Sequence, residues 1–148
     1  MNDSPVEVSR GELAVSTERS RIDVAAALSL LRATHWGAGI RQDTLLRAIA
    51  NSVCFGVYRE TELIGIGRVI TDLATYAYWT DVVIAQSHRG RGLGRWLSDC
   101  MLAHPELQTL RRVALLTRDA TSLYAEMGFS RGPGNLIYME RKPPGNAA

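Results

Sequence analysis

Residues 82–97 read VVIAQSHRGRGLGRWL, and this stretch decides how the rest of the chain is interpreted. An apolar run comes first and ends in a loop rich in arginine and glycine: Arg89, Gly90, Arg91, Gly92, Gly94 and Arg95. Apolar residues at helical spacing follow, namely Leu93, Trp96, Leu97 and Met101. The order of local structure is therefore strand, glycine loop, helix.

A loop of this kind can bind phosphate groups. Its glycines let several backbone N–H groups converge on one point, and the helix N-terminus behind them adds a partial positive charge. A P-loop is excluded because no Lys-Ser or Lys-Thr pair follows a glycine. A dinucleotide fingerprint is excluded because Leu97 stands where the last glycine of that motif would follow Gly92 and Gly94. The loop predicts a site for a diphosphate of another kind.

Composition limits the class of protein. With 148 residues, 46% of them hydrophobic and 22% charged, the chain can form one soluble domain with a substantial core. A net charge of +2 does not by itself indicate binding to nucleic acid, and the local arginine clusters suit a phosphorylated ligand better than a long polyanion. No apolar stretch reaches about 18 residues, and the N-terminus does not resemble a signal peptide. We therefore expect a cytoplasmic protein without membrane contact.

The two cysteines, Cys54 and Cys100, lie in apolar surroundings and are predicted to be buried free thiols. Neither has a histidine or cysteine at the spacing of a metal site, so we expect no bound metal.

Hydrophobic periodicity predicts a mixed sheet with helices. The expected strands are residues 13–16, 52–58, 63–71, 75–85, 113–117 and 136–139, and the expected helices are 22–33, a second one capped by Asp43, 93–103 and 120–127. The second helix would bury Leu45, Leu46 and Ile49, and Gly128 would end the last one. Short turns between 52 and 85 imply an antiparallel meander. Residues 1–10 and 142–148 are predicted to be loose tails around a domain of residues 11–141.

The spacing R-x-x-G-x-G at Arg89, Gly92 and Gly94 resembles the acyl-CoA loop of the GCN5-related N-acetyltransferase (GNAT) superfamily. The element order is also similar over residues 11–141. The resemblance implies an α/β (α+β) fold, the GNAT acyl-CoA N-acyltransferase fold, with a mixed, mostly antiparallel sheet flanked by helices. It implies acetyl-CoA as co-substrate, with its pyrophosphate on the loop residues Arg89, Gly90, Arg91, Gly92, Leu93, Gly94 and Arg95. It further implies that the strand carrying Val82, Val83 and Ile84 splays from the next strand and lines the pantetheine arm.

The resemblance also supplies a catalytic acid. Residues 119–129, DATSLYAEMGF, are similar to the GNAT segment in which a tyrosine shortly precedes a Gly-aromatic pair. Tyr124 would donate its phenolic proton to the departing thiolate; the alternative is a tyrosine packed on one helix face. The family often has asparagine at the start of this helix. Here Asp119 is expected to be the N-cap, and Ser122 takes the polar contact with the pantetheine arm.

Asp81 resembles the strand carboxylate that some family members use to deprotonate the acceptor. Aspartate is unusual in a strand, and a partly buried carboxylate can have a raised pKa that suits a base. The alternatives are an anion that binds substrate, or an aspartate paired with an arginine. Relatives that use a water chain need no such base.

The acceptor pocket is harder to identify from sequence. We predict that Trp36, in a break between two helices, and Tyr78 and Trp79, in an aromatic run, line this pocket. His35, Tyr76 and Glu140 are further candidates for its wall. Aromatic residues two apart are more often one packed sheet face. An aromatic and acidic pocket would suit a cationic amine. His88 is interpreted as a solvated loop residue.

Three functions compete. The first is an N-acetyltransferase that moves the acetyl group of acetyl-CoA to a primary amine of a small molecule, amino acid or peptide by direct attack in a ternary complex. The second is a non-catalytic acyl-CoA sensor, which the presence of Tyr124 and Asp81 disfavours. The third is an RNA-binding protein, which the lack of a wider basic face disfavours. Since family members are often dimers, a homodimer is the assembly that the resemblance allows.

Overall fold

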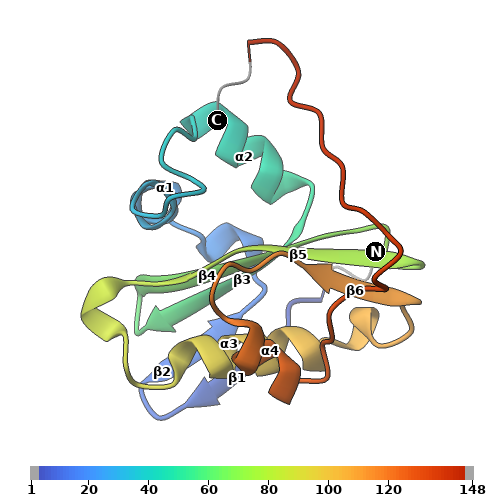
Figure 1. Ribbon diagram of the computed structural model, residues 1–148. Helices are drawn as coiled ribbons and strands as arrows, with labels where there is room; N and C mark the ends of the chain where they lie inside the picture. The colour runs from blue at the N-terminus through green and yellow to red at the C-terminus, as the bar shows by residue number, and fades with distance from the viewer. Residues whose placement is uncertain (1–3, 146–148) are drawn as a thin grey trace.

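A computed structural model describes residues 4–145. Its centre is a six-stranded sheet in which spatial order follows chain order (Figure 1). The strands are β1 (Glu7–Arg10), β2 (Leu13–Ser16), β3 (Val53–Arg59), β4 (Glu62–Thr71), β5 (Tyr76–Ile84) and β6 (Arg112–Leu115). Neighbours run antiparallel except β5 and β6, which are parallel. The predicted fold class and the meander from β3 to β5 are confirmed.

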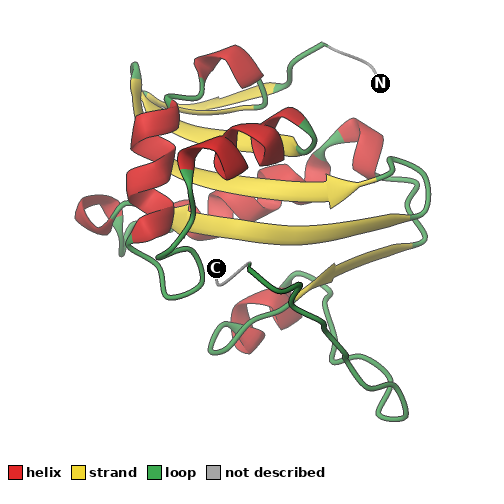
Figure 2. Cartoon of the chain, turned by 90° about the horizontal axis from the view of Figure 1, so that it is seen from above, coloured by secondary structure: helices red, strands yellow, loops and turns green. Residues whose placement is uncertain are grey.

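Helices cover both faces of the sheet (Figures 1 and 2). α1 (Val24–Arg32) and α2 (Gln42–Ala50) lie on one face, and α3 (Leu93–Ala103) and α4 (Thr121–Glu126) lie on the other. Short 3₁₀ helices occupy Arg19–Arg21, Gln86–His88 and Pro105–Leu107. Asp23 caps α1 by accepting a hydrogen bond from the Ala26 N–H at 3.1 Å. The chain therefore has a helix–sheet–helix arrangement with two hydrophobic layers.

Each hydrophobic layer uses one face of the strands, because side chains alternate along a strand. The layer under α3 includes Phe55, Val69, Trp79, Leu97 and Met101. The layer under α1 and α2 includes Leu28, Leu45, Tyr58 and Ile66. Gly67 lets α3 approach β4 closely, since a Cβ there would lie 2.8 Å from the Met101 sulfur.

The pairing of β4 with β5 contains a bulge. Ile66 pairs with Val83 and Arg68 pairs with Thr80, so that Asp81 and Val82 together oppose Gly67. Asp81 has a φ of 56°, a left-handed conformation that costs an L-residue about 1–2 kcal/mol. The strand therefore changes direction just before Val82, Val83 and Ile84.

β5 is paired on its other side for only part of its length. Four residues, Tyr76 to Trp79, match Arg112 to Leu115 of β6. Beyond Trp79, β5 has no strand partner on this side within residues 4–145. The splay predicted between these two strands is confirmed.

Some sequence predictions were wrong. Residues 7–10, expected to be loose, form β1, because a two-residue turn through Gly11 (φ 61°) brings them beside β2. Leu136 to Met139 form no strand and are strongly exposed. Asp43 lies inside α2, where Arg41 is the N-cap, and Leu46 is half exposed. The outermost parts of the two predicted tails, 1–3 and 146–148, lie outside the described residues.

His104 ends α3, and its properties predict a pH effect on stability. The side chain is 6% exposed, packs edge-on against Phe55, and accepts a hydrogen bond at Nδ1 from the Glu106 N–H at 3.3 Å. Burial lowers the pKa of His104, and the Glu106 charge opposes this in part. An unfolded histidine titrates near about 6.5. As pH falls through that value the unfolded chain binds the proton first, so the free energy of unfolding should decrease.

Urea unfolding at pH 7 and pH 5 measures this effect. The loss of stability between the two pH values should be smaller in His104→Asn, which keeps a side-chain acceptor for the turn but does not titrate. Equal losses in the wild type and the variant would contradict the assignment to His104.

Candidate active site

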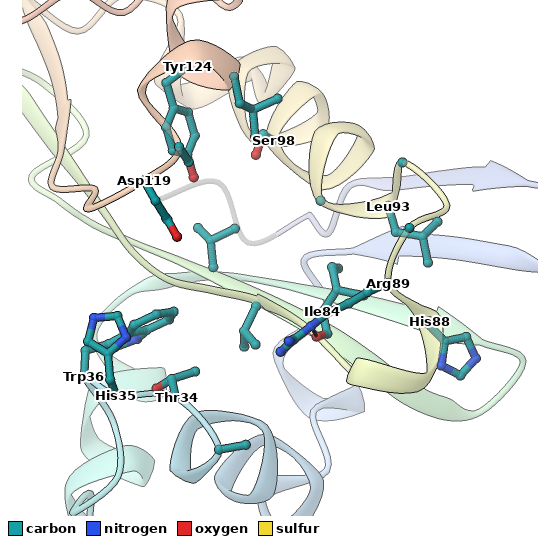
Figure 3. A pocket seen from close by; sticks show the side chains of 18 residues that line it. Thr34, His35, Trp36, Ile84, His88, Arg89, Leu93, Ser98, Asp119 and Tyr124 are labelled. Carbon is teal, nitrogen blue, oxygen red and sulfur yellow. Dashed lines mark hydrogen bonds between the residues drawn. The ribbon is translucent and has the colours of Figure 1, made fainter.

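A cavity of about 590 Å³ lies where the sheet opens. β5, the connection after α1, the glycine loop, α3 and α4 all contribute to its wall (Figure 3). Side chains of Tyr124 and Ser98 reach into it from one side, opposite Thr34, His35 and Trp36. The lining residues are Ala33, Thr34, His35, Trp36, Val82, Val83, Ile84, His88, Arg89, Gly90, Gly92, Leu93, Gly94, Ser98, Asp119, Ala120, Leu123 and Tyr124.

The N-terminus of α3 forms one end of this cavity. Gly92 is its N-cap with a φ of 73°, and Gly90 has a φ of 78°; both are conformations that favour glycine. The first hydrogen bond of the helix runs from the Trp96 N–H to the Gly92 carbonyl at 3.0 Å, and no side chain caps the helix. The N–H groups of the first turn therefore have no partner within the helix and can bind an anion.

The three loop arginines have different positions. Arg89 lines the cavity, and its Nε donates to the Ile84 carbonyl at 3.0 Å, which ties the loop to the end of β5. Arg95 does not line the cavity; it bridges Asp99 of α3 at 3.2 Å and Glu126 of α4 at 2.9 Å. Arg91 is exposed and also lies outside the wall. Of the predicted arginines, the structure places Arg89 alone in the cavity wall.

Tyr124 fits both interpretations considered from sequence, a residue that faces the cavity and a tyrosine packed on one helix face. It lines the cavity, and its ring packs edge-on against Trp79 and Phe129 at centroid distances of 6.4 and 5.7 Å. Burial raises the pKa of the Tyr124 phenol, while the neighbouring Ser98 hydroxyl acts in the opposite direction. A tyrosine phenol, with an ordinary pKa of about 10, is protonated at neutral pH, and this shift keeps it so; it can therefore donate a hydrogen bond.

The start of α4 differs from the prediction. Ala120 is the N-cap, and its N–H donates to the Thr117 hydroxyl at 3.0 Å. Asp119 lies one residue earlier and points into the cavity (Figure 3). Ser122 is exposed and does not line the cavity. Asp119 is thus a wall residue rather than a cap, and the predicted contact of Ser122 with the pantetheine arm finds no support in its position.

Asp81 is paired with an arginine, as the alternative interpretation expected. Its Oδ2 lies 2.8 Å from the Arg68 Nε, and the two side chains are 10% and 14% exposed. Asp81 does not line the cavity, although the next three residues do.

The aromatic candidates separate into three environments. Trp36 lines the cavity and is 49% exposed. Trp79 is 3% exposed in the core under α4, so its predicted place in the acceptor pocket was wrong. Tyr78 is half-buried and outside the cavity wall. Trp36 is therefore the aromatic candidate that remains for substrate contact.

Sequence reasoning missed several wall residues. His88 is buried and lines the cavity, which corrects its interpretation as a solvated residue; the Ser87 hydroxyl lies 2.9 Å from its Nδ1. Thr34 and Ser98 were not predicted, whereas His35 was expected to line the pocket and does so. Ser98 lies on the buried face of α3 beside Leu97 and Met101. A polar residue among apolar ones on a helix face is a sequence signal that could have identified it.

Comparisons with known proteins agree with this geometry. Residues 50–131 match the family model described as an acetyltransferase (GNAT) domain. The chain belongs to the GNAT family. A protein of Gibberella zeae that is named as an acetyltransferase, FG08082, is 34% identical over 146 residues, which covers 82% of this chain and 81% of the relative.

Solved GNAT structures show the same fold. A Xanthomonas campestris pv. campestris protein, xcc2953, named as a GNAT acetyltransferase, is 41% identical with a TM-score of 0.84, covering 90% of this chain and 95% of that one. A Clostridium acetobutylicum protein, named as a predicted acetyltransferase and crystallised with acetyl-CoA, shares the fold at 11% identity and a TM-score of 0.62, covering 93% and 95%. This GNAT chain is accordingly an acetyltransferase by family.

Within residues 4–145, no group of three or more His, Cys, Asp or Glu side chains could hold a metal ion. No helix in this range is both long and apolar enough to cross a bilayer. Both cysteines are free thiols as predicted; Cys54 is buried and Cys100 is half-buried.

Gly92 provides a test of the anion site. Alanine at this position would have a Cβ in a left-handed conformation, which costs about 1–2 kcal/mol and strains the start of α3. Gly92→Ala should therefore weaken coenzyme A binding about tenfold, the change that corresponds to about 1.4 kcal/mol, in isothermal calorimetry.

Gly11→Ala is the matched control, because Gly11 has a similar φ of 61° in the β1–β2 turn and a Cβ there would also meet open space. Similar affinities in the two variants would show that the start of α3 does not bind the coenzyme.

Proposed function

We propose that this GNAT protein transfers the acetyl group of acetyl-CoA to a primary amine of a small molecule, amino acid or peptide. The acceptor would attack the thioester directly in a ternary complex, with positioning of the two substrates supplying much of the rate gain. One observation carries the proposal: a single cavity joins the uncapped N-terminus of α3, the unpaired edge of β5 and the Tyr124 phenol.

The phosphate groups of the coenzyme fit the loop end of the cavity. The first-turn N–H groups of α3 and the partial positive charge of the helix end would bind the pyrophosphate. Arg89 adds a cation, and the tie of its Nε to Ile84 holds the loop next to the strand. Arg89 would therefore attract the phosphates and also hold the glycine loop against the end of β5.

The thioester fits the opened part of the sheet. Residues after Trp79 in β5 have backbone groups that, within the described chain, pair with no strand on the β6 side. N–H groups on this side can donate hydrogen bonds to the carbonyl oxygen as it gains charge. Val82, Val83 and Ile84 line the cavity at this point, which supports their proposed contact with the pantetheine arm.

Tyr124 is the proposed acid for the departing thiolate. A tyrosine phenol, with an ordinary pKa of about 10, is protonated at neutral pH, and burial raises the pKa of Tyr124 further. The phenol reaches the cavity between β5 and α3. The proton would move from the phenolic oxygen to the coenzyme sulfur as the carbon–sulfur bond breaks.

The acceptor would approach from the side of Trp36. Among the described wall residues, Asp119 is the one with a carboxylate, and it points toward the region of His35 and Trp36 (Figure 3). A carboxylate and an indole together attract a cationic amine. The acceptor must lose a proton before it can attack, so water or a wall residue has to accept that proton.

Replacement of Tyr124 by phenylalanine tests the acid. Tyr124→Phe should lower kcat about 100-fold, the lower end of general acid catalysis, with little change in the Kd of coenzyme A. The measurement is thiol release from acetyl-CoA with a panel of amines.

Tyr138→Phe is the control, because Tyr138 is 65% exposed and lies outside the cavity. Unchanged turnover in Tyr124→Phe would remove the phenol from the mechanism. Coenzyme binding without thiol release on any amine would refute the proposed function itself.

A further inference from the structure

The bulge in β5 is held by a buried ion pair that the proposed chemistry does not use directly. Arg68 on β4 donates from Nε to Asp81 Oδ2 at 2.8 Å, and both side chains are largely buried. Asp81 is the bulge residue with positive φ, so this contact fixes the side chain of the strained position.

The same arginine also connects the bulge to another element. Arg68 Nη1 donates to the Ser52 hydroxyl at 2.9 Å, and that hydroxyl donates to the Ala48 carbonyl of α2 at 2.7 Å. Ser52 is also held through its backbone, because Arg19 donates to the Ser52 carbonyl at 3.3 Å. The forked guanidinium therefore ties the bulge to the end of α2, a geometry that a lysine cannot reproduce.

We infer that Arg68 and Asp81 are a positioning pair, which holds the β5 bulge so that the backbone of Val82, the next residue, faces the thioester. This inference rests on the proposed function. The bulge inserts one extra residue opposite Gly67, and the strand turns into the cavity at the next residue. If the pair is lost, Asp81 can relax toward ordinary strand geometry, which would rotate the backbone donors of the following residues.

The geometry favours positioning over a role for Asp81 as the base. A general base must reach the proton that it removes, directly or through one water. Asp81 does not line the cavity, and its carboxylate is held by Arg68 on the α2 side of the sheet. The two roles predict opposite effects of Arg68→Gln on turnover: a loss if the pair positions the strand, and retained or increased turnover if Asp81 is the base.

Four variants separate the roles. Asp81→Asn keeps an oxygen acceptor for Arg68 and tolerates a left-handed backbone, whereas Asp81→Ala keeps neither property. Arg68→Gln removes the positive charge. Arg68→Lys keeps the charge but loses the forked geometry, and it serves as a milder variant if Arg68→Gln does not fold. Arg59→Gln is the control, because it breaks the Arg59–Glu12 pair in the same sheet, away from the cavity.

The positioning role predicts a kinetic pattern. Arg68→Gln and Asp81→Ala should lower kcat at least tenfold, on the order expected for a small misplacement of reacting groups, with the Kd of coenzyme A changed less than about threefold. Asp81→Asn and Arg59→Gln should retain most of the turnover, and Arg68→Lys should be intermediate. Amide shifts of Val82 and Val83 in ¹⁵N spectra should move in Arg68→Gln and not in Arg59→Gln.

Two results would overturn the inference. Loss of turnover in Asp81→Asn, together with retained or increased turnover in Arg68→Gln, would identify Asp81 as the base. Wild-type kcat and unmoved amide shifts in a folded Arg68→Gln or Arg68→Lys protein would show that the pair positions nothing. A wild-type protein without turnover on any amine would instead refute the proposed function, and the amide shifts would still test the pair.

Discussion

The structure depends on the hydrogen bonding of one strand, β5. It is paired on both sides from Ala77 to Trp79, and then on the β4 side alone. A strand with one free edge inside a domain exposes backbone donors and acceptors that must find a partner. In this fold the free edge faces a cavity rather than another strand, and the N-terminus of α3 lies at the end of the same cavity. Fold and function thus share one constraint, the early separation of β5 from β6.

Local signals in the sequence predicted the parts that local chemistry determines. α3 was predicted at 93–103 as observed, because a glycine loop precedes it and His104-Pro105 ends it. The positive φ of Gly92 and the left-handed Gly128 follow from their places beside helix ends. The β3–β5 meander follows from short turns between apolar runs. Each of these features depends on residues close together in the chain.

Features set by distant residues were not predicted. Asp81 resembles a catalytic carboxylate in sequence, but its partner Arg68 is 13 residues away across a bulge that no local pattern reveals. The aromatic run gave no sign that Trp79 faces the core while Tyr78 faces the other side. Leu136 to Met139 have the composition of a strand, yet within the described residues they pair with none. Tertiary pairing decided each case, as expected for β structure.

The short contact between β5 and β6 has a mechanical consequence. Tyr124 follows β6 in the chain, and its position relative to β5 depends on four paired residues, the rings of Trp79 and Phe129, and the bridge from Arg95 to Glu126. The N-terminus of α3 forms the other end of the cavity, and α3 buries Leu93, Trp96, Leu97, Ser98 and Met101, whereas no residue of α4 is fully buried. Loosening of the β5–β6 contact would therefore move Tyr124, the proposed proton donor, away from the N-terminus of α3, the proposed phosphate site.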